Sequence, residues 1–293
     1  PGGQTWGPCY SPRAAQRCLL PANIRTNVSV MHAEVDRVGI FIGGVQKAGT
    51  TSLHSYFMEH PALLAPRKKE THFFDNETVD WSNRDYRTDL HNKFYPKARL
   101  GAIAYDATPI TIFWPPAVER ILAYNPDAKF IFLFRDPIER AFSHWRMEIE
   151  RNAESLPFSA AIREGRERLN GLPELHWDYR VYTYVERGFY GHQVERLLRQ
   201  VPRDQLLFLS STELATKPSA VLATIADFLS IEPFPETSPR RVFVGSASTE
   251  LAEGDVEYLS TIFSEDTQRF AALTDLDVSD WLVCKPRTAA LGR

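Results

Sequence analysis

Four continuous apolar runs separated by amphipathic segments are the feature that most limits the folds open to this chain of 293 residues. Each run is short enough for a strand, and continuous apolar character indicates a strand buried on both faces. The runs cover residues 38–42, 100–105, 129–134 and 205–209, and helical patterns cover 50–58, 116–124, 137–151, 188–200 and 255–270. This order predicts an α/β fold with a central parallel sheet flanked by helices on both faces.

The rest of the chain is assigned by composition. With 43% hydrophobic and 12% aromatic residues, the sequence has enough apolar surface for one large core. Residues 1–36 lack a clear period and are predicted to form an extended N-terminal leader on a single domain of residues 37–293. Within that domain, the polar segment 152–187 is predicted to be a helical insertion or lid.

Charge and cysteine content narrow the classes of partner and compartment. A formal net charge of -3 argues against a general nucleic-acid binder, and no apolar run approaches the ~20 residues of a membrane span. Cys9, Cys18 and Cys284 show no metal-ligand spacing; a Cys9–Cys18 disulfide is an alternative to the simpler reduced, cytoplasmic protein. If an N-terminal anchor has been removed before Pro1, the expected location changes to the Golgi lumen.

The first apolar run leads into a loop that is P-loop-like but has the wrong lysine. A Walker loop has lysine directly after its second conserved glycine, whereas this chain has Thr50 there and carries Lys47 inside the loop. The start of a helix offers free backbone N–H groups, and Thr50, Thr51 and Ser52 add hydroxyls. The loop therefore predicts a phosphate or sulfate site, with a structural glycine turn as the alternative.

A second anion site is predicted after the third apolar run. Arg135 stands at the carboxyl end of that strand and can meet a phosphate with a bidentate fork, while Ser143 lies about two turns along the following helix. A salt bridge from Arg135 to Glu139 is the structural alternative. Asp136 could instead be the Mg²⁺ ligand of an ATP-dependent kinase, although the arginine before it favours an anion.

A third motif, Lys69-Glu-Thr-His-Phe-Phe-Asp75, offers a general base. In an extended segment, period-two alternation puts Glu70 and His72 on one face and Asp75 on the other. A positioned carboxylate can take the proton of an attacking alcohol or amine. Without the other two motifs, this charged stretch would be read as a solvated turn.

Together these motifs resemble the sulfotransferases that use 3′-phosphoadenosine 5′-phosphosulfate (PAPS), most closely the carbohydrate type of heparan sulfate N- and 3-O-sulfotransferases and their bacterial relatives. The resemblance covers about residues 38–228. It implies that the 5′-phosphosulfate is held by Gln46, Lys47, Ala48, Gly49, Thr50, Thr51 and Ser52. It also implies that Arg135 and Ser143 bind the 3′-phosphate, that Glu70 is the base and that His72 is its active-site partner.

Other assignments by resemblance are looser. Ala107 stands where the heparan enzymes have a lysine, and the acceptor side is expected to involve Lys69, Asp75, Asp106 and Thr108. No Lys-Gly-Arg loop is present over the adenine, so Arg240 and Arg241 are the candidates for the 3′-phosphate side, and Tyr190 is expected near the cofactor.

The sequence thus predicts a sulfotransferase that moves a sulfuryl group from PAPS to a hydroxyl, or less readily an amine, of a glycan or small-molecule acceptor. The product would be adenosine 3′,5′-bisphosphate (PAP), and lysine replaces the metal, so no metal is expected. An ATP- and Mg²⁺-dependent small-molecule kinase and a non-catalytic nucleotide-binding protein remain the alternatives. The sequence carries no signal for the acceptor's identity or the oligomeric state.

Overall fold

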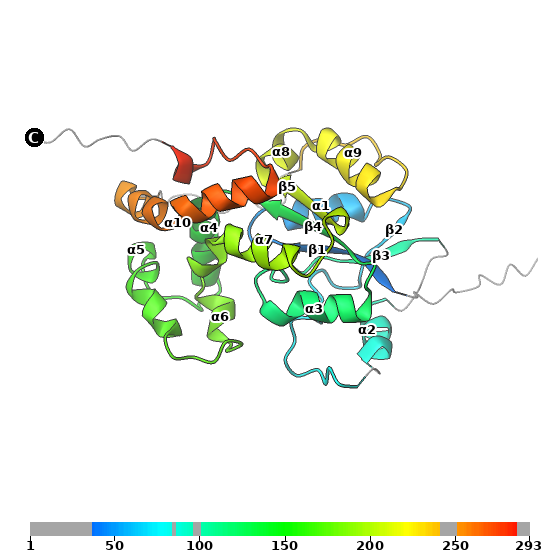
Figure 1. Cartoon of the computed structure of the whole chain (residues 1–293), viewed down its shortest axis with the longest axis horizontal. Helices are drawn as coiled ribbons and strands as arrows, with labels where there is room; N and C mark the ends of the chain where they lie inside the picture. The colour runs from blue at the N-terminus through cyan, green and yellow to red at the C-terminus, as the bar shows by residue number, and fades with distance from the viewer. Residues whose placement is uncertain (1–36, 84–85, 96–100, 241–250, 286–293) are drawn as a thin grey trace, which may run out of the picture. The chain divides into compact units, whose positions relative to one another are not determined.

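A parallel sheet of five strands lies at the centre of the fold, in the order β2-β3-β1-β4-β5 (Figure 1). Its strands are β1 Val38–Gly44, β2 Leu63–Leu64, β3 Ile103–Asp106, β4 Lys129–Phe134 and β5 Leu206–Ser210. In the central pair, Ile40 lies opposite Lys129 and Phe41 opposite Phe130. The predicted parallel sheet is therefore confirmed, and the two-residue strand β2 is an addition that the apolar pattern did not reveal.

This computed structural model describes residues 37–83, 86–95, 101–240 and 251–285, all within the unit His32–Arg293. The predicted leader over residues 1–36, Cys9, Cys18 and Arg241 lie outside the described residues. In the part of the chain that the structure describes, no helix is both long enough and apolar enough to cross a membrane.

Helices cover both faces of the sheet because the chain leaves β1 in one direction and returns across it in the other. Helix α1, Thr50–Phe57, follows β1 on the way to β2 and β3, whereas α3, Pro115–Tyr124, connects β3 to β4 across β1. Right-handed crossovers in opposite directions place their helices on opposite faces. Figure 1 shows α1 above the strands and α3 below them, which confirms the prediction.

The remaining helices include the other three predicted ones and several that were not predicted. They are α2 Tyr86–Phe94, α4 Pro137–Glu150, α5 Phe158–Ala161, α6 Asp178–Val181, α7 Tyr190–Leu198, α8 Ser211–Thr216, α9 Pro218–Leu229 and α10 Glu253–Thr274. Short 3₁₀ turns are η1 Glu164–Leu169, η2 Glu186–Gly188, η3 Arg203–Gln205 and η4 Leu282–Cys284. The segment 152–187 thus consists of short helical turns joined by irregular chain.

The aromatic side chains of β4 pack tightly in the core at the centre of the sheet. Phe130 and Phe132 stack with ring centroids 6.1 Å apart, and Phe134 packs on Phe270 of α10 at 4.6 Å. All three β4 phenylalanines are buried, and each contributes about 1.5–3 kcal/mol through burial. The carboxyl ends of β1 and β4 are therefore held rigidly beside each other.

Glycine is required where β1 ends. A Cβ on Gly44 would lie 2.7 Å from Cγ2 of Ile112, and one on Gly43 would lie 2.7 Å from Cε1 of Phe132. Side chains at these positions would push the strand away from its neighbours. The two glycines therefore let the chain turn tightly over the end of the sheet.

Candidate active site

The donor loop, residues 44–52, joins β1 to α1 at the carboxyl end of the sheet. Lys47 and Gly49 adopt left-handed backbone conformations, with φ of 72° and 91°. Gly49 is the N-cap of α1, and no side chain caps this end of the helix. The amide of Val45 donates to the Leu133 carbonyl at 2.7 Å, which fixes the loop to β4. The uncapped start of the helix leaves backbone N–H groups that an anion could bind.

Three cationic side chains gather at this loop. Nη1 of Arg187 donates to Oε1 of Gln46 at 2.7 Å, and Nη1 of Arg135 donates to the Lys47 carbonyl at 3.4 Å. Burial, and then the positive charge of Arg151, lower the pKa of the Lys47 ammonium. Burial, followed by the charge of Arg140, lowers the pKa of Arg187 to about 9. Because burial disfavours the charges of Lys47 and Arg187, a bound anion would stabilise both.

Arg135 forms the structural salt bridge that the sequence offered as the alternative to phosphate binding, and it also contacts the donor loop. Its Nε donates to Oε2 of Glu139 at 3.0 Å, which is the predicted structural salt bridge, while the same guanidinium contacts the donor loop. Ser143 lies partly exposed on α4. A phosphate at Arg135 would therefore share the guanidinium with Glu139.

Asp136 has a structural task. Its Oδ1 accepts from the amides of Ile138 and Glu139 at 2.8 and 2.9 Å, so it caps the N-terminus of α4. Its carboxyl group is buried. This use weighs against Asp136 as the metal ligand of a kinase, because the carboxylate is already occupied by helix amides. Within the described ranges, no group of three or more His, Cys, Asp or Glu side chains is arranged to hold a metal ion.

The base loop, residues 66–75, has a different backbone from the predicted one. Glu70 and His72 have φ of 61° and 48°, so the segment is not extended and the alternation argument is wrong. The turn is held from outside, because the Thr71 amide donates to Oδ1 of Asp106 at 3.3 Å and the His72 amide to Oγ1 of Thr108 at 3.4 Å. Tertiary hydrogen bonds have overridden the local preference.

This turn nevertheless brings the predicted groups together. Nε2 of His72 lies 3.5 Å from Oε2 of Glu70, and Nδ1 of His72 lies 2.9 Å from Oδ2 of Asp75. Asp75, predicted on the opposite face, therefore joins the same cluster. The imidazole lies between two carboxylates.

The charged groups of this cluster shift one another's pKa values so that each charged form is favoured. Hydrogen bonds to Asp75 and then to Glu70 raise the pKa of His72 to about 9. Burial raises the pKa of Glu70, but the hydrogen bond from His72 and the charge of Lys69 outweigh it and lower that pKa to about 2. Nζ of Lys69 lies 2.5 Å from Oε1 of Glu70, whose side chain is 36% exposed. At neutral pH, Glu70 is thus an ionised carboxylate that solvent or an acceptor can reach.

Arg180 is a site residue that the sequence analysis missed. Its Nη1 donates to Oδ2 of the buried Asp75 at 2.5 Å, and its Nη2 donates to the Asp75 carbonyl. Its guanidinium carbon lies 4.1 Å from the ring centroid of Trp114. Arg187, three residues before the predicted Tyr190, was missed too. Neither arginine belongs to a spacing pattern that could have identified it in the sequence.

The remaining predicted residues are placed less directly at the site. Asp106 and Thr108 are buried beneath the base loop, where they hold its backbone. Tyr190 is buried in the core, with its ring centroid 5.2 Å from that of Phe134, which is a packing position. Nη2 of Arg240 pairs with Oε2 of Glu59 at 2.6 Å, just beyond the carboxyl end of α1 and so away from the donor loop at its other end.

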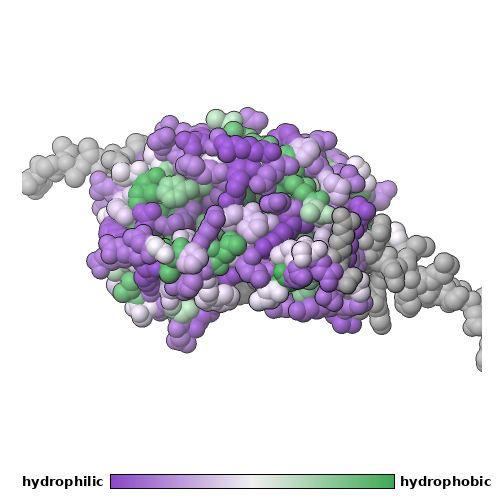
Figure 2. Space-filling view, turned by 60° about the horizontal axis from the view of Figure 1, so that its bottom comes forward, coloured by the Kyte–Doolittle hydropathy of each residue, from purple (hydrophilic) through white to green (hydrophobic). Residues whose placement is uncertain are grey.

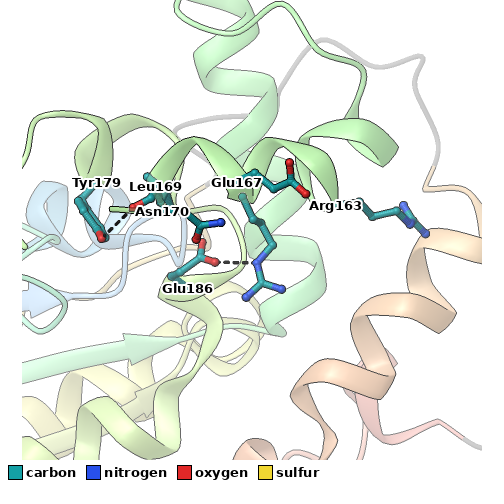
Figure 3. Close-up of a pocket in the computed structure, with 7 residues that line it drawn as sticks. Arg163, Glu167, Leu169, Asn170, Tyr179 and Glu186 are labelled. Atoms are coloured by element: carbon teal, nitrogen blue, oxygen red, sulfur yellow. Dashed lines mark hydrogen bonds and ion pairs between the residues drawn. The ribbon is translucent and has the colours of Figure 1, made fainter. Parts of the chain in front are cut away.

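A separate cavity of about 430 Å³ lies in the segment 152–187 (Figure 3). Figure 3 shows Glu186 pointing toward the arginine that binds it, with Nε of Arg166 2.7 Å from Oε1 of Glu186. The lining contains no residue of either loop: it consists of Arg163, Arg166, Glu167, Leu169, Asn170, Tyr179 and Glu186.

Known proteins resemble this chain in sequence. A family model described as the sulfotransferase family matches residues 68–236, more than half of the chain. The heparan sulfate glucosamine 3-O-sulfotransferase 3B1 of Mus musculus is 30% identical over 191 residues, which is 64% of this chain and 45% of that protein. The match therefore spans less than half the length of this curated relative.

A solved structure resembles this chain over a larger share of its length. A sulfotransferase from Alicyclobacillus acidocaldarius superposes with a TM-score of 0.66 at 28% identity, covering 84% of this chain and 98% of that one. The bifunctional heparan sulfate N-deacetylase/N-sulfotransferase 3 of Mus musculus is 27% identical over 199 residues, 65% of this chain and 22% of that protein. The resemblance inferred from the motifs is thereby confirmed, and the chain belongs to the sulfotransferase family.

Proposed function

We propose that this protein transfers a sulfuryl group from PAPS to a hydroxyl, or less readily an amine, of an acceptor. The proposal rests on the ionised carboxylate of Glu70, which Lys69 and His72 contact in the base loop. The segment 152–187 contacts the base loop through Arg180 and the donor loop through Arg187. The general base and the anion site are thus positioned relative to each other by the same segment of the chain. Membership of the sulfotransferase family supports the same chemistry.

The donor would be held by the two anion sites. The amides and hydroxyls of residues 46–52 would bind the 5′-phosphosulfate, and Arg135 with Ser143 would bind the 3′-phosphate. The buried cations at the loop fit such a dianionic end, because Arg187 and Lys47 both lie in surroundings that lower their pKa. PAP would be the product, and lysine takes the place that a metal has in kinases.

In the transfer, the acceptor oxygen forms a bond to sulfur as the bond from sulfur to the phosphate oxygen breaks in line. Glu70 accepts the proton that the acceptor hydroxyl loses, and Lys47 stabilises the negative charge that develops on the leaving phosphate. His72, held protonated between Glu70 and Asp75, fixes the orientation of the base. The segment 152–187 would act as a lid that supplies Arg180 and Arg187 to the two loops.

For the acceptor, we favour a glycan over other small molecules. The curated relatives are named for action on heparan sulfate. In this chain, the exposed residues Arg67 and Lys68 directly precede Lys69 and Glu70, so positive charge borders the base. An anionic saccharide is compatible with that border.

The test is transfer from labelled PAPS to a heparan sulfate oligosaccharide and to a phenol, with Glu70→Gln and Lys47→Ala variants. We expect kcat to fall about 10²–10⁴-fold for Glu70→Gln and about 10²–10³-fold for Lys47→Ala. The surface variants Glu195→Gln and Lys217→Ala are matched controls with unchanged turnover. Wild-type turnover in both site variants would contradict the mechanism, and ATP-dependent phosphorylation abolished by a chelator would favour the kinase instead.

A further inference from the structure

The indole of Trp177 is exposed to solvent. The surface drawn in Figure 2 is mostly hydrophilic, with apolar residues in separate patches. Among the described residues, the large hydrophobic side chains with most of their surface exposed are Met58 and Trp177, at 62% and 68%. Burying such a side chain would stabilise the fold, so its exposure forgoes a stabilising contact. Isolated exposed residues are common, and the position of Trp177 must therefore decide its meaning.

Trp177 directly precedes α6, and contacts that follow it in the chain tie this segment to both loops. On one side, Arg180 binds Asp75 at 2.5 Å, and Asp75 binds His72, the partner of Glu70. On the other side, Nη2 of Arg187 donates to the Arg180 carbonyl at 3.0 Å while its Nη1 binds Gln46. The segment is thus positioned relative to the donor loop and the base loop at once.

The indole of Trp177 lies close to Arg180, the residue that joins this segment to the base loop. The guanidinium carbon of Arg180 lies 5.8 Å from the ring centroid of Trp177 and 4.1 Å from that of the buried Trp114. The Trp177 carbonyl accepts from the Arg180 amide at 2.8 Å, so its backbone is part of an ordered turn. A rigid aromatic surface loses little entropy when a ligand covers it.

We propose that Trp177 is a stacking platform for a sugar ring of the acceptor, in a subsite that adjoins the base loop. The apolar C–H face of a pyranose can cover an indole, while its hydroxyls need polar neighbours. His176 and Asp178 flank the indole in the chain and are both partly exposed. A single indole between polar residues lacks the contiguous apolar area of a protein interface, which favours a saccharide. This inference rests on the proposed function for the identity of its ligand.

The experiment measures binding of a heparan sulfate hexasaccharide by calorimetry in the presence of PAP. We expect Trp177→Ala to weaken hexasaccharide binding about tenfold, because the stacking contact with the sugar ring is lost. Trp177→Phe should retain most of the affinity, and Met58→Ala, the other exposed apolar residue, should match the wild type. PAP affinity should be the same in all four proteins. Hexasaccharide binding by Trp177→Ala equal to that of the wild type, or no binding by the wild type, would overturn the inference.

Turnover separates this inference from the proposed activity. If the wild type transfers sulfate to the hexasaccharide, Trp177→Ala should raise the acceptor KM with little change in kcat, and an unchanged KM would overturn the platform while the activity stands. If the wild type binds the hexasaccharide without transfer and Trp177→Ala loses the binding, the platform stands and the activity fails. Thermal unfolding shows whether Trp177→Ala has a folding defect. If it does, Trp177→Phe is compared with Trp177→Leu: tighter hexasaccharide binding by Trp177→Phe supports stacking, and equal binding by the two variants overturns it.

Discussion

The donor loop and the base loop lie at the same site but obtain their shapes in different ways. The donor loop follows a strand, turns at glycines and opens a helix, so most of its conformation is encoded within residues 38–57. Its backbone bond from Val45 to Leu133 joins it to the adjacent strand β4 and needs no particular side chain. The base loop has no regular structure, and its backbone is held by Asp106, Thr108 and Arg180, which are 35, 36 and 105 positions from their partners.

This difference separates two kinds of preorganisation. A locally encoded loop keeps its shape as long as its own residues are kept. A loop encoded by distant contacts loses its shape when a remote residue changes, even though every residue of the loop is intact. Substitutions at remote and local positions therefore distinguish the two loops.

The largest effect is expected from Arg180→Gln, a substitution outside both loops. It removes one of the two charged partners of the Asp75 carboxylate, whose side chain is 2% exposed, and leaves only His72. Removing one partner of a buried ion pair costs about 3 kcal/mol, because the buried charge loses part of its compensation. Urea unfolding measures this loss, and kcat should fall with it because His72 depends on Asp75. The exposed pair of Arg199 with Glu195 is the control, and Arg199→Gln should cost below about 1 kcal/mol. Equal costs for the two arginines would show that the base loop is not held from a distance.

A smaller effect is expected from Gly49→Ala within the donor loop. Nothing lies within 4 Å of the added Cβ, so only the left-handed φ of 91° opposes the substitution. We expect a loss of about 1 kcal/mol in unfolding free energy and a weaker affinity for PAP, since the N-cap must shift.

The matched control for that substitution is Gly254→Ala at the start of α10. Its added Cβ also meets nothing within 4 Å, but the residue lies in a helix, where alanine is preferred. Gly254→Ala should therefore leave stability unchanged or raise it slightly. A loss of stability equal to that of Gly49→Ala would mean that the donor-loop backbone is not strained.

The parallel sheet could be predicted because its physical cause is local in the sequence. Strands buried on both faces must be continuously apolar, as in Phe130–Phe134, and amphipathic patterns identify the helices between them. Strand β2 was missed because two residues carry no periodicity. Helix α9 was also missed, although Pro218 at its start and the apolar Val221, Leu222 and Ile225 are a recognisable signal.

The site could be predicted only in part, for the same reason. Lys47 and Gly49 stand in a spacing that defines the donor loop, whereas the grouping of Glu70 with His72 was inferred from an extended backbone that does not exist. Arg180 reaches Asp75 only because the chain folds the segment 152–187 over the base loop. No pattern in one sequence records such a contact, and Arg187 was likewise not predicted although Tyr190, three residues later, was.

The smallest expected effect is a pH dependence confined to the base loop. The folded-state pKa of His72 is raised to about 9, so its contribution to stability is fully present below about pH 6.5 and is lost as the pH rises through about 9. Because the side chain is 44% exposed, solvent screening keeps this contribution below about 1 kcal/mol. In urea unfolding, His72→Gln should be less stable than the wild type at pH 6, and the difference should vanish by pH 10. The difference between Gly49→Ala and the wild type should stay constant over the same range, because that substitution involves no titrating group. If the His72→Gln difference also stayed constant, hydrogen bonding of a neutral imidazole would hold the base loop, and the two loops would differ in the range of their contacts but not in their use of charge.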